Sequence, residues 1–289
     1  MTKRLIQLML WITIAGNLTA GYAPSGVSME VSQVGPHSYY VMGAPGMATD
    51  NEGFISNAGF VITDAGVVLF DALGSPSLAW MLREKIRTLT DQPVVKVIVS
   101  HYHADHVYGL QVFQDEGAEV IAPRGAFEYL ESPAAASRLE ERRFSLDPWV
   151  NDDTRLVAPD RMVEQSMAFQ VGGIDFRLSY LGSAHSQGDM AMFVVQDGVL
   201  YSGDIIFEGR VPLVGDADVG HWLQTLQALE TGNLKALVPG HGPAARRPKE
   251  AVSLTRRYLA RLRQVMGEAV ENLVDCETAY SEADWSEFS

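Results

Sequence analysis

The sequence predicts an α/β fold, and three observations lead to that prediction. Short apolar stretches rich in Val and Ile, which favour buried strands, recur in both halves of the chain. Segments whose apolar residues follow helical spacing lie between and after these stretches. The 289 residues are 47% hydrophobic, which is enough for a substantial core. Strands mixed with helices in both halves predict paired sheets that are covered by helices.

The first half of the chain is expected to alternate strands and helices. The stretch "GFVITDAGVVLFDA" (59–72) predicts two strands around a turn. Over residues 75–90 apolar side chains follow helical spacing, and Ser75 or Ser77 can cap this helix. The stretch "VVKVIVS" (94–100) predicts a buried strand. We expect a short helix to Asp115, a strand over 118–123 and a charged helical region over 124–155 to follow.

The second half is expected to contribute most of the remaining strands. Strands are predicted over 167–171, 173–181, 189–196, 198–204 and 234–242. Asp218 is expected to cap a helix, and residues 248–270 are expected to form a long terminal helix. The acidic tail after Glu271 is expected to be frayed. Composition never shifts enough to mark a boundary, so residues 24–289 are predicted to form a single domain.

The charge of the chain excludes one class of partner. Lys and Arg total 22 against 36 Asp and Glu, which gives a formal net charge of −14. Nucleic-acid affinity depends on clustered cations, and the sequence has no run of Lys or Arg. We therefore expect a small-molecule substrate and no nucleic-acid partner. The sequence leaves the oligomeric state open.

The N-terminus has the pattern of a secretory signal peptide. Lys3 and Arg4 precede a short apolar run, and small residues follow it. The run is shorter than the ~20 residues of an ordinary membrane span. We predict a signal peptide over residues 1–23, cleaved after Ala20 or Ala23, with no stable membrane anchor afterwards. The mature protein is therefore expected to be periplasmic or secreted.

The stretch "SHYHADHVYG" (100–109) holds three of the seven histidines within six residues, beside an aspartate. It begins where a predicted buried strand stops, and strand-end loops commonly carry the chemistry of α/β folds. Imidazole and carboxylate groups suit Zn²⁺ and related ions. In an extended chain His101 and His103 share a side, and Asp105 with His106 can face a second point nearby. The motif therefore predicts two metal ions.

Three later stretches repeat this pattern of a metal-ligand residue type after a predicted strand. They are "GSAHSQGD" with His185, "YSGD" with Asp204, and "PGHG" with His241. The remaining histidines, His37 and His221, lack this setting and are expected to have no catalytic role.

The order His-x-His-x-Asp-His, then His, then Gly-Asp, then Gly-His-Gly resembles the pattern of the metallo-β-lactamase superfamily. The resemblance runs from about residue 31 to residue 265 and includes Asp71 in "VLFDA". It implies a four-layer αββα sandwich with two zinc ions at one edge, iron or manganese being the alternative metals. It assigns His101, His103 and His185 to the first metal, Asp105, His106 and His241 to the second, and Asp204 to a bridge between them. It also implies that Asp71, and with less support Asp189, orients ligands from behind.

Such a centre implies a hydrolase. A water or hydroxide between the two ions is the expected nucleophile, because zinc lowers the pKa of bound water from ~15.7 to about 7. Asp105 or the bridging water is expected to handle the proton afterwards.

Two further features are candidates for substrate contact. Arg210 could bind a substrate carboxylate, and Met42 and Met47 lie in a Gly-containing segment where family members have a flap.

Position 204 separates branches of the family. The best-known β-lactamase subclass carries Cys there and another carries Ser, whereas Asp204 matches glyoxalase II-like hydrolases. The acidic C-terminus and the predicted export do not suit the glutathione thioester of glyoxalase II itself. The segment over residues 201–218 is similar to exported metallohydrolases linked to sulfur-oxidation and quinoprotein systems. The resemblance thus implies a small ester, thioester, lactone or amide as substrate.

Three alternatives remain open at this point. The first is β-lactam hydrolysis, which the Asp at position 204 disfavours but does not exclude. The second is a persulfide dioxygenase-like oxygenase, which shares the scaffold and holds one iron through two histidines and an aspartate. The third is a binding protein that kept the fold without catalysis, against which the complete set of seven ligands argues.

Overall fold

The computed structural model describes residues 21–229 and 234–288. The predicted signal peptide falls almost entirely outside these residues. Within the described part of the chain, none of the helices combines the length and the apolar character that a membrane crossing requires.

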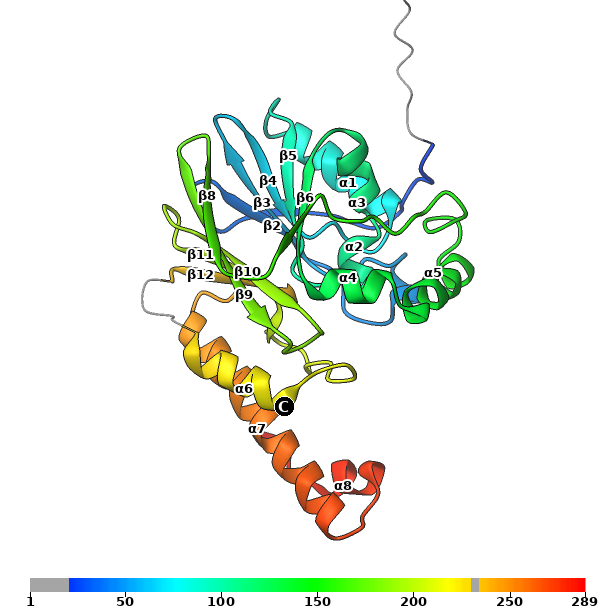
Figure 1. The fold of residues 1–289 in the computed structure, drawn as a ribbon, viewed down its shortest axis with the longest axis vertical. Coiled ribbons are helices and arrows are strands. Elements are labelled where there is room, and N and C mark those ends of the chain that lie inside the picture. Colours follow the sequence, from blue (N-terminus) through cyan, green and yellow to red (C-terminus); the bar gives the residue numbers. More distant parts are fainter. Residues whose placement is uncertain (1–20, 230–233, 289) are drawn as a thin grey trace, which may run out of the picture.

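Two sheets form the centre of the molecule (Figure 1). The first has seven strands in sequence order, and the second has five strands in the order β12-β11-β10-β9-β8. The strands of the first sheet are β1 (Val31–Gln33), β2 (Ser38–Val41), β3 (Ala58–Thr63), β4 (Gly66–Phe70), β5 (Val94–Ile98), β6 (Glu119–Pro123) and β7 (Arg161–Val163). Those of the second are β8 (Met167–Val171), β9 (Ile174–Gly182), β10 (Asp189–Val194), β11 (Val199–Phe207) and β12 (Ala236–His241).

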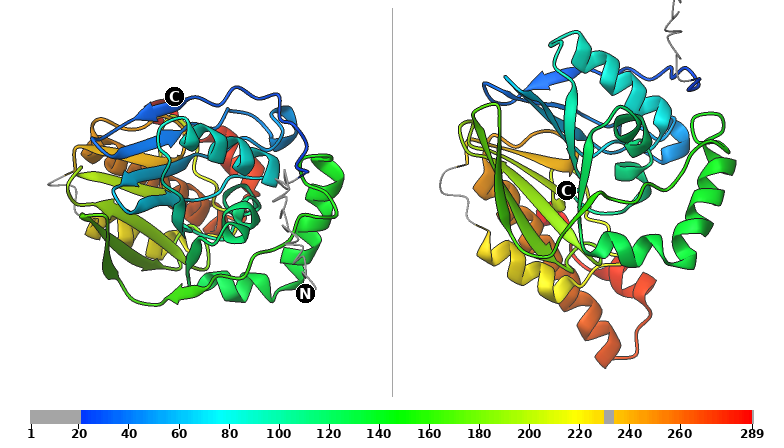
Figure 2. Two further views of the ribbon diagram at one scale, coloured as in Figure 1. Left: turned by 90° about the horizontal axis from the view of Figure 1, so that it is seen from above. Right: turned by 45° about the horizontal axis from the view of Figure 1, so that its top comes forward.

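The sheets pack face to face through side chains that alternate along their strands. In β4, Val68 and Phe70 point into a core shared with Phe176 and Met192 of the second sheet. Their neighbours in β4 belong instead to a core beneath α1 (Pro76–Arg87) and α3 (Leu110–Asp115). The second sheet is covered on its outer face by α6 (Val219–Ala228) and α7 (Pro248–Glu271). The layers are therefore helix, sheet, sheet, helix, as expected (Figure 2).

Local sequence signals account for the helices. The Oγ of Ser75 accepts a hydrogen bond from the backbone N–H of Leu78 at 3.2 Å, and Pro76 occupies the first turn of α1. Asp218 caps α6 in the same way, through the N–H of His221 at 2.9 Å. Both caps match the predictions made from the sequence.

One strand differs from the prediction at the site itself. We expected Asp204 and His241 at the ends of strands over 198–204 and 234–242; His241 is indeed the last residue of β12, but β11 continues past Asp204 to Phe207. The pairing of these two strands shifts register between Tyr201 and Gly203 and again between Gly203 and Phe207. The irregularity lets the backbone of β11 continue past Asp204 while its carboxylate turns toward the edge of the sheet.

The charged region after residue 123 is less helical than expected. It contains the short α4 (Gly125–Leu130) and α5 (Pro133–Ser145), and residues 146–160 have no long element. Strands β1, β2 and β7 were not predicted, because they have only three or four residues each and no apolar run.

The C-terminal tail is folded, which contradicts the prediction that it is frayed. It forms α8 (Cys276–Glu282) and a 3₁₀ turn η2 (Ser286–Phe288) that returns to α7. Trp285 and Phe288 pack on Tyr258 of α7, with ring centroids 5.7 and 5.3 Å away. Aromatic contacts of this kind stabilise the tail although its acidic residues favour solvent.

Candidate metal centre

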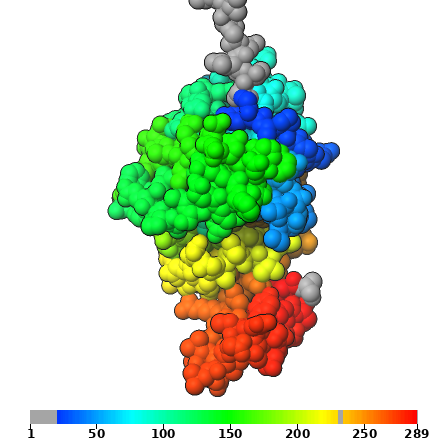
Figure 3. Space-filling model, turned by 90° about the vertical axis from the view of Figure 1, so that its right-hand side faces the viewer, coloured from blue at the N-terminus to red at the C-terminus, as the bar shows by residue number. Residues whose placement is uncertain are grey.

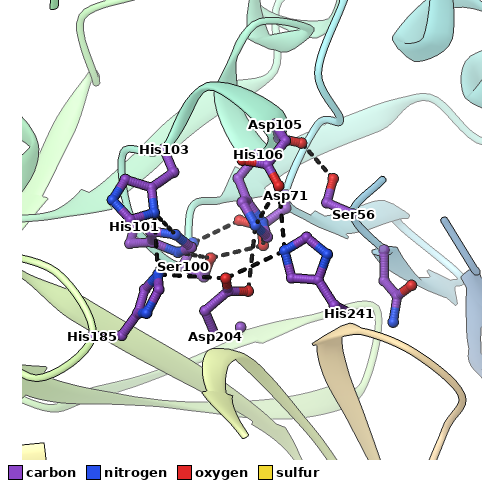
Figure 4. A network of polar contacts seen from close by, with 12 residues as sticks. Ser56, Asp71, Ser100, His101, His103, Asp105, His106, His185, Asp204 and His241 are labelled. Atoms are coloured by element: carbon purple, nitrogen blue, oxygen red, sulfur yellow. Dashed lines mark hydrogen bonds and ion pairs between the residues drawn. The ribbon is translucent and has the colours of Figure 1, made fainter. Parts of the chain in front are cut away.

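Seven ligand-type side chains from both sheets meet at one edge of the sandwich (Figure 4). His101 and His103 follow β5, and Asp105 and His106 belong to α2 (Ala104–Val107). The second sheet supplies the others, with His185 from the turn before β10, Asp204 from β11 and His241 from β12. The structure thus brings together all seven residues that the sequence singled out.

Three histidines form the first group. Nδ1 of His103 lies 2.9 Å from Nε2 of His101 and 3.1 Å from Nε2 of His185. Burial lowers the pKa of His101 and His103, and lowers the pKa of His185 to about 4. The three imidazoles are therefore neutral at pH 7, which is the form that binds a metal.

Asp105, His106 and His241 form a second group. Oδ2 of Asp105 lies 3.5 Å from Nε2 of His106 and 3.3 Å from Nε2 of His241. Burial alone would lower the pKa of both histidines, but the carboxylates of Asp105 and Asp204 raise that of His106 well above its usual value and that of His241 to about 10. Without another cation, these two imidazoles carry the positive charge that the carboxylates attract.

Asp204 stands between the two groups. Its Oδ2 is 3.4 Å from Nε2 of His185 and 3.3 Å from Nε2 of His241, and its Oδ1 is 3.4 Å from Nε2 of His106. Burial opposes ionisation of this carboxyl, but His241 and His106 hold its pKa well below the usual range. Asp204 is 4% exposed and charged, so its carboxylate can interact electrostatically with both groups at once.

The unsatisfied atoms of the centre fit a pair of cations. Among the described residues, Nε2 of His106 and Oδ1 of Asp204 are buried and, although they lie 3.4 Å apart, neither has a partner with the geometry of a hydrogen bond. Such groups are rare in folded proteins unless something else fills the space. Four of the five histidines also direct their other ring nitrogen to an oxygen, at Ser100 Oγ (2.9 Å, His101), Leu213 O (3.1 Å, His185), Asp71 Oδ2 (2.9 Å, His106) and Ile55 O (2.8 Å, His241). These contacts select the tautomer whose free lone pair points inward.

Asp71 lies directly behind the ligands. Its carboxylate accepts hydrogen bonds from the N–H and Oγ of Ser100, at 2.7 and 2.8 Å, and from Nδ1 of His106. Its backbone φ is 61°, in the left-handed region that residues other than Gly seldom adopt. The carboxylate therefore ties the end of β5 to the helix that carries Asp105 and His106, at some cost in backbone strain.

Asp189 supports the loop around His185 rather than the imidazole itself. It accepts hydrogen bonds from the N–H groups of Ala184 at 3.1 Å and Ser186 at 2.9 Å, which flank His185. Burial raises the pKa of Asp189 to about 6, although these hydrogen bonds oppose the shift. The role suggested by the sequence is thus a contact with the backbone on both sides of a ligand.

A close approach of β12 to β11 requires glycine at position 240. A Cβ on Gly240 would lie 1.8 Å from Oδ1 of Asp204. Gly240 is therefore required because a side chain would not fit, and not because of a positive φ, which Gly240 does not have.

The three residues predicted to contact substrate, Arg210, Met42 and Met47, are less closely tied to the centre. Arg210 lies within electrostatic range of Asp204 and Asp105, which oppose the lowering of its pKa by burial. Met42 and Met47 are 47% and 70% exposed and lie at the start of the segment that leads to Ile55. His37 and His221 lie outside the centre and bond Asp197 and the carbonyl of Ser183.

Sequence reasoning missed several residues that shape the centre. The amide of Asn57 donates to the carbonyls of Pro239 and Gly242, 2.8 Å each, and so spans the turn that carries His241. Ser56 donates from Oγ to the carbonyl of Asp105. The carbonyls of Leu213 and Ile55 bond imidazoles, but backbone acceptors leave no signal in a sequence. An Asn directly before a strand, as Asn57 is before β3, is likewise indistinguishable in the sequence from a turn residue.

Comparison with known proteins identifies what the chain is similar to. A family profile described as "Metallo-beta-lactamase superfamily" matches residues 51–241. "Metallo-beta-lactamase IND-1" of Chryseobacterium indologenes is 23% identical over 193 residues, which cover 65% of this chain and 72% of that protein. "Metallo-beta-lactamase type 2" of Elizabethkingia meningoseptica is 25% identical over 200 residues, which cover 65% of this chain and 69% of that protein.

Two solved structures extend the comparison to the fold. A metallo-beta-lactamase from Pontibacter korlensis superimposes with a TM-score of 0.62 at 21% identity, over 81% of this chain and 99% of that one. The sec-alkylsulfatase Pisa1 from Pseudomonas sp. gives a TM-score of 0.70 at 19% identity, over 89% of this chain and 45% of that one. At these identities the likeness shows a shared fold.

Proposed function

Since the chain belongs to the metallo-β-lactamase superfamily and is a metal-dependent hydrolase, we propose that it holds two zinc ions and hydrolyses a small ester, thioester, lactone or amide. The observation that carries this proposal is the convergence of seven ligand side chains in three overlapping groups. One group is His101 with His103 and His185, another is Asp105 with His106 and His241, and the third joins Asp204 to His101 and His106.

The ligand assignment follows the groups. His101, His103 and His185 would hold the first ion, Asp105, His106 and His241 the second, and Asp204 would bridge them. When bound, two zinc ions would polarise the scissile carbonyl and lower the pKa of a shared water to about 7, so that hydroxide is available as nucleophile.

Two carboxylates then differ in what they can do with a proton. The side chain of Asp204 is 4% exposed and that of Asp105 is 21% exposed. Asp105 is therefore the carboxylate that can exchange a proton with a leaving group at the mouth of the site. Asp204 stays charged and fixed between the groups, and Asp71 and Asp189 position the ligands without reaching the substrate.

Arg210 is the cation that we assign to a substrate carboxylate. Arg210 is half-buried and lies within electrostatic range of Asp204 and Asp105, so its guanidinium can attract an anionic group to the mouth of the centre. Met42 and Met47 are proposed to cover an apolar part of the substrate when the segment over residues 42–54 moves. The N-terminal pattern supports export, and we propose a periplasmic or secreted location.

The first experiment measures metal content and hydrolysis together. Zinc-loaded protein should contain two equivalents of zinc and should cleave chromogenic thioesters and lactones, and Asp204→Ala should abolish this turnover. A single equivalent of iron with oxygen uptake on a persulfide would replace the proposal with an oxygenase. Full metal content without turnover of any substrate in a broad hydrolase screen would favour a binding protein.

β-Lactam hydrolysis is the second candidate function, because the names of several similar proteins carry it. A chromogenic cephalosporin tests it directly. Turnover that vanishes in Asp204→Ala would establish a site wide enough for a bicyclic amide. Absence of turnover, with thioesters still cleaved, would restrict the enzyme to smaller substrates.

A further inference from the structure

A pocket opens beside His103, on the side of the centre away from Asp105. It has a volume of about 220 Å³ and is lined by His103, Tyr102, Tyr129, Glu128, Ser186 and Asp216, among others. Tyr129 and Glu128 come from α4, and Asp216 comes from the 209–217 loop, the segment of residues 209–217 that also carries Arg210. Figure 3 shows the segment of α4 and α5 in green, directly above yellow residues of this loop.

The pocket is part of the centre because one of its walls is a ligand. His103 belongs to the first group of histidines, and Nε2 of its ring is 3.7 Å from Oδ2 of Asp216. The side chain of Asp216 is 77% exposed, whereas Ser100 and Asp71, which accept from His101 and His106, are buried. A substrate whose carbonyl meets the metals would therefore extend past His103 into this space.

The lining combines aromatic rings with negative charge. The rings of Tyr102 and Tyr129 are 6.3 Å apart and tilted by 55°, so that they form two walls of a corner. Glu128 and Asp216 are the charged residues of the lining, and no Lys or Arg belongs to it. Aromatic faces and carboxylates around one cavity attract an ammonium group.

Nearby cations do not fill this role. Arg124 pairs with Glu128 at 3.4 Å and with Glu164 at 3.2 Å, and all three side chains are at least half exposed. Exposed pairs of this kind are weak and give way to a better-placed cation. Arg138 and Arg142 act electrostatically on Tyr129 from α5, but both pair with Glu141 and neither lines the pocket.

We propose that this pocket binds a positively charged ammonium group of the substrate and so sets the specificity of the enzyme. The inference rests on the proposed hydrolase function and narrows it to cationic esters, thioesters or amides. Together with Arg210 on the side of Asp105 and Asp204, it leads to substrates that carry an ammonium group at one end and an anionic group at the other.

The test compares two thioesters of the same shape. Acetylthiocholine carries a trimethylammonium group, and 3,3-dimethylbutyl thioacetate replaces the nitrogen with carbon. With zinc-loaded protein and a chromogenic thiol reagent, we expect kcat/KM for the cationic thioester to exceed that for the neutral one about tenfold. The ratio should fall toward one in the double variant Glu128→Gln/Asp216→Asn.

Matched variants distinguish the contribution of the Tyr129 ring from that of its hydroxyl, and the contribution of pocket charges from that of surface charges. Tyr129→Phe should keep the preference and Tyr129→Leu should lose most of it, since the aromatic face is what binds the cation. Glu131→Gln removes an exposed charge outside the pocket and should leave the ratio unchanged. A wild-type ratio of one or below, or a ratio that survives the double variant, would overturn the proposal.

Binding of tetramethylammonium alone distinguishes this proposal from the hydrolase proposal. Saturation-transfer NMR should detect its binding to wild-type protein and its loss in Glu128→Gln/Asp216→Asn. If binding follows this pattern but no ester, thioester, lactone or amide is cleaved, the proposed hydrolysis fails and the pocket assignment stands. If thioesters are cleaved without preference and tetramethylammonium does not bind, the pocket assignment fails and the hydrolase stands.

Discussion

At the scale of single residues, the centre depends on hydrogen bonds that end on atoms outside it. Asp71 holds both Ser100 and His106, and without its carboxylate three buried donors lose their acceptor. The ring of His106 would then be free to rotate away from Asp204. The residues behind the candidate ligands thus help to fix the geometry of the centre.

The first prediction follows from this dependence. Asp71→Ala should weaken zinc binding about 10- to 100-fold, because the tautomer and orientation of His106 are no longer fixed. Competition with a chromophoric zinc chelator measures the change. Asp64→Ala, which removes an exposed aspartate in the β3–β4 turn, should bind zinc like the wild type. Equal affinities in all three proteins would show that Asp71 has no role in the centre.

The raised pKa of Asp189 predicts a pH-dependent stability. The folded protein binds the proton of Asp189 up to a pKa of about 6, whereas the unfolded chain releases it near 3.8. This contribution is therefore complete below about pH 4 and is lost as the pH rises to about 6, a change on the order of 3 kcal/mol. Asp189→Asn cannot titrate and should lack it.

Denaturant unfolding of zinc-free protein at pH 4, 5, 6 and 7 measures this difference. The free energy of unfolding of the wild type, minus that of Asp189→Asn, should decrease across the range. A difference that is constant with pH would show that Asp189 titrates normally in the folded protein.

At the scale of secondary structure elements, the strands of the site can be predicted only in part. Residues 167–171, 58–63 and 66–70 have apolar patterns that predict β8, β3 and β4 within one or two residues. The continuation of β11 beyond Asp204 to Phe207 could not be predicted, because a buried carboxylate in the middle of a strand is acceptable only beside the partners that the fold supplies. Those partners are distant in sequence.

Replacement by alanine is predicted to harm activity at Gly240, where β12 approaches β11, and to increase stability at Gly267 in α7. Gly240→Ala places a methyl group against Asp204 and should reduce activity by about 100-fold or more, since small displacements of catalytic groups are costly. Gly267→Ala lies on the exposed side of α7 with nothing within 4 Å, and should raise the free energy of unfolding by ~0.5–1 kcal/mol.

Activity assays and thermal unfolding of both variants check this pair. Normal activity in Gly240→Ala would mean that Asp204 can shift without loss, which the proposed bridging role does not allow. A loss of stability in Gly267→Ala would contradict the regular helix seen at that position.

At the scale of the whole molecule, the layers could be predicted but the surroundings of the site could not. Alternation of strands and helices, with the motif order, predicts the sandwich and its ligands. The pocket beside His103 depends on α4, α5 and the 209–217 loop, which carry no motif. The folded tail was missed because its stability comes from Trp285 and Phe288 meeting Tyr258, and this contact depends on the path of the chain.

Metal removal tests how far the centre supports the fold. The cores between the layers do not include the seven ligands, so a chelator should leave the far-ultraviolet circular dichroism spectrum unchanged. The melting temperature should nevertheless fall by roughly 10 °C, because tight ligand binding adds about 4 kcal/mol at a thousandfold excess over Kd. An unchanged melting temperature would indicate that no metal binds, and a lost spectrum would indicate that metal is needed for folding.

The two sheets follow one another along the chain, and this order has a consequence for the construction of the enzyme. All strands of the first sheet end by Val163, and those of the second begin at Met167. Neither segment holds a complete metal site, because His101 and His103 lie before this junction and His185 lies after it. If the centre binds metal as proposed, a gene cut at residues 164–166 would therefore yield two inactive polypeptides whose reassembly responds to the metal. The protein is in this sense a natural candidate for a split reporter of metal availability.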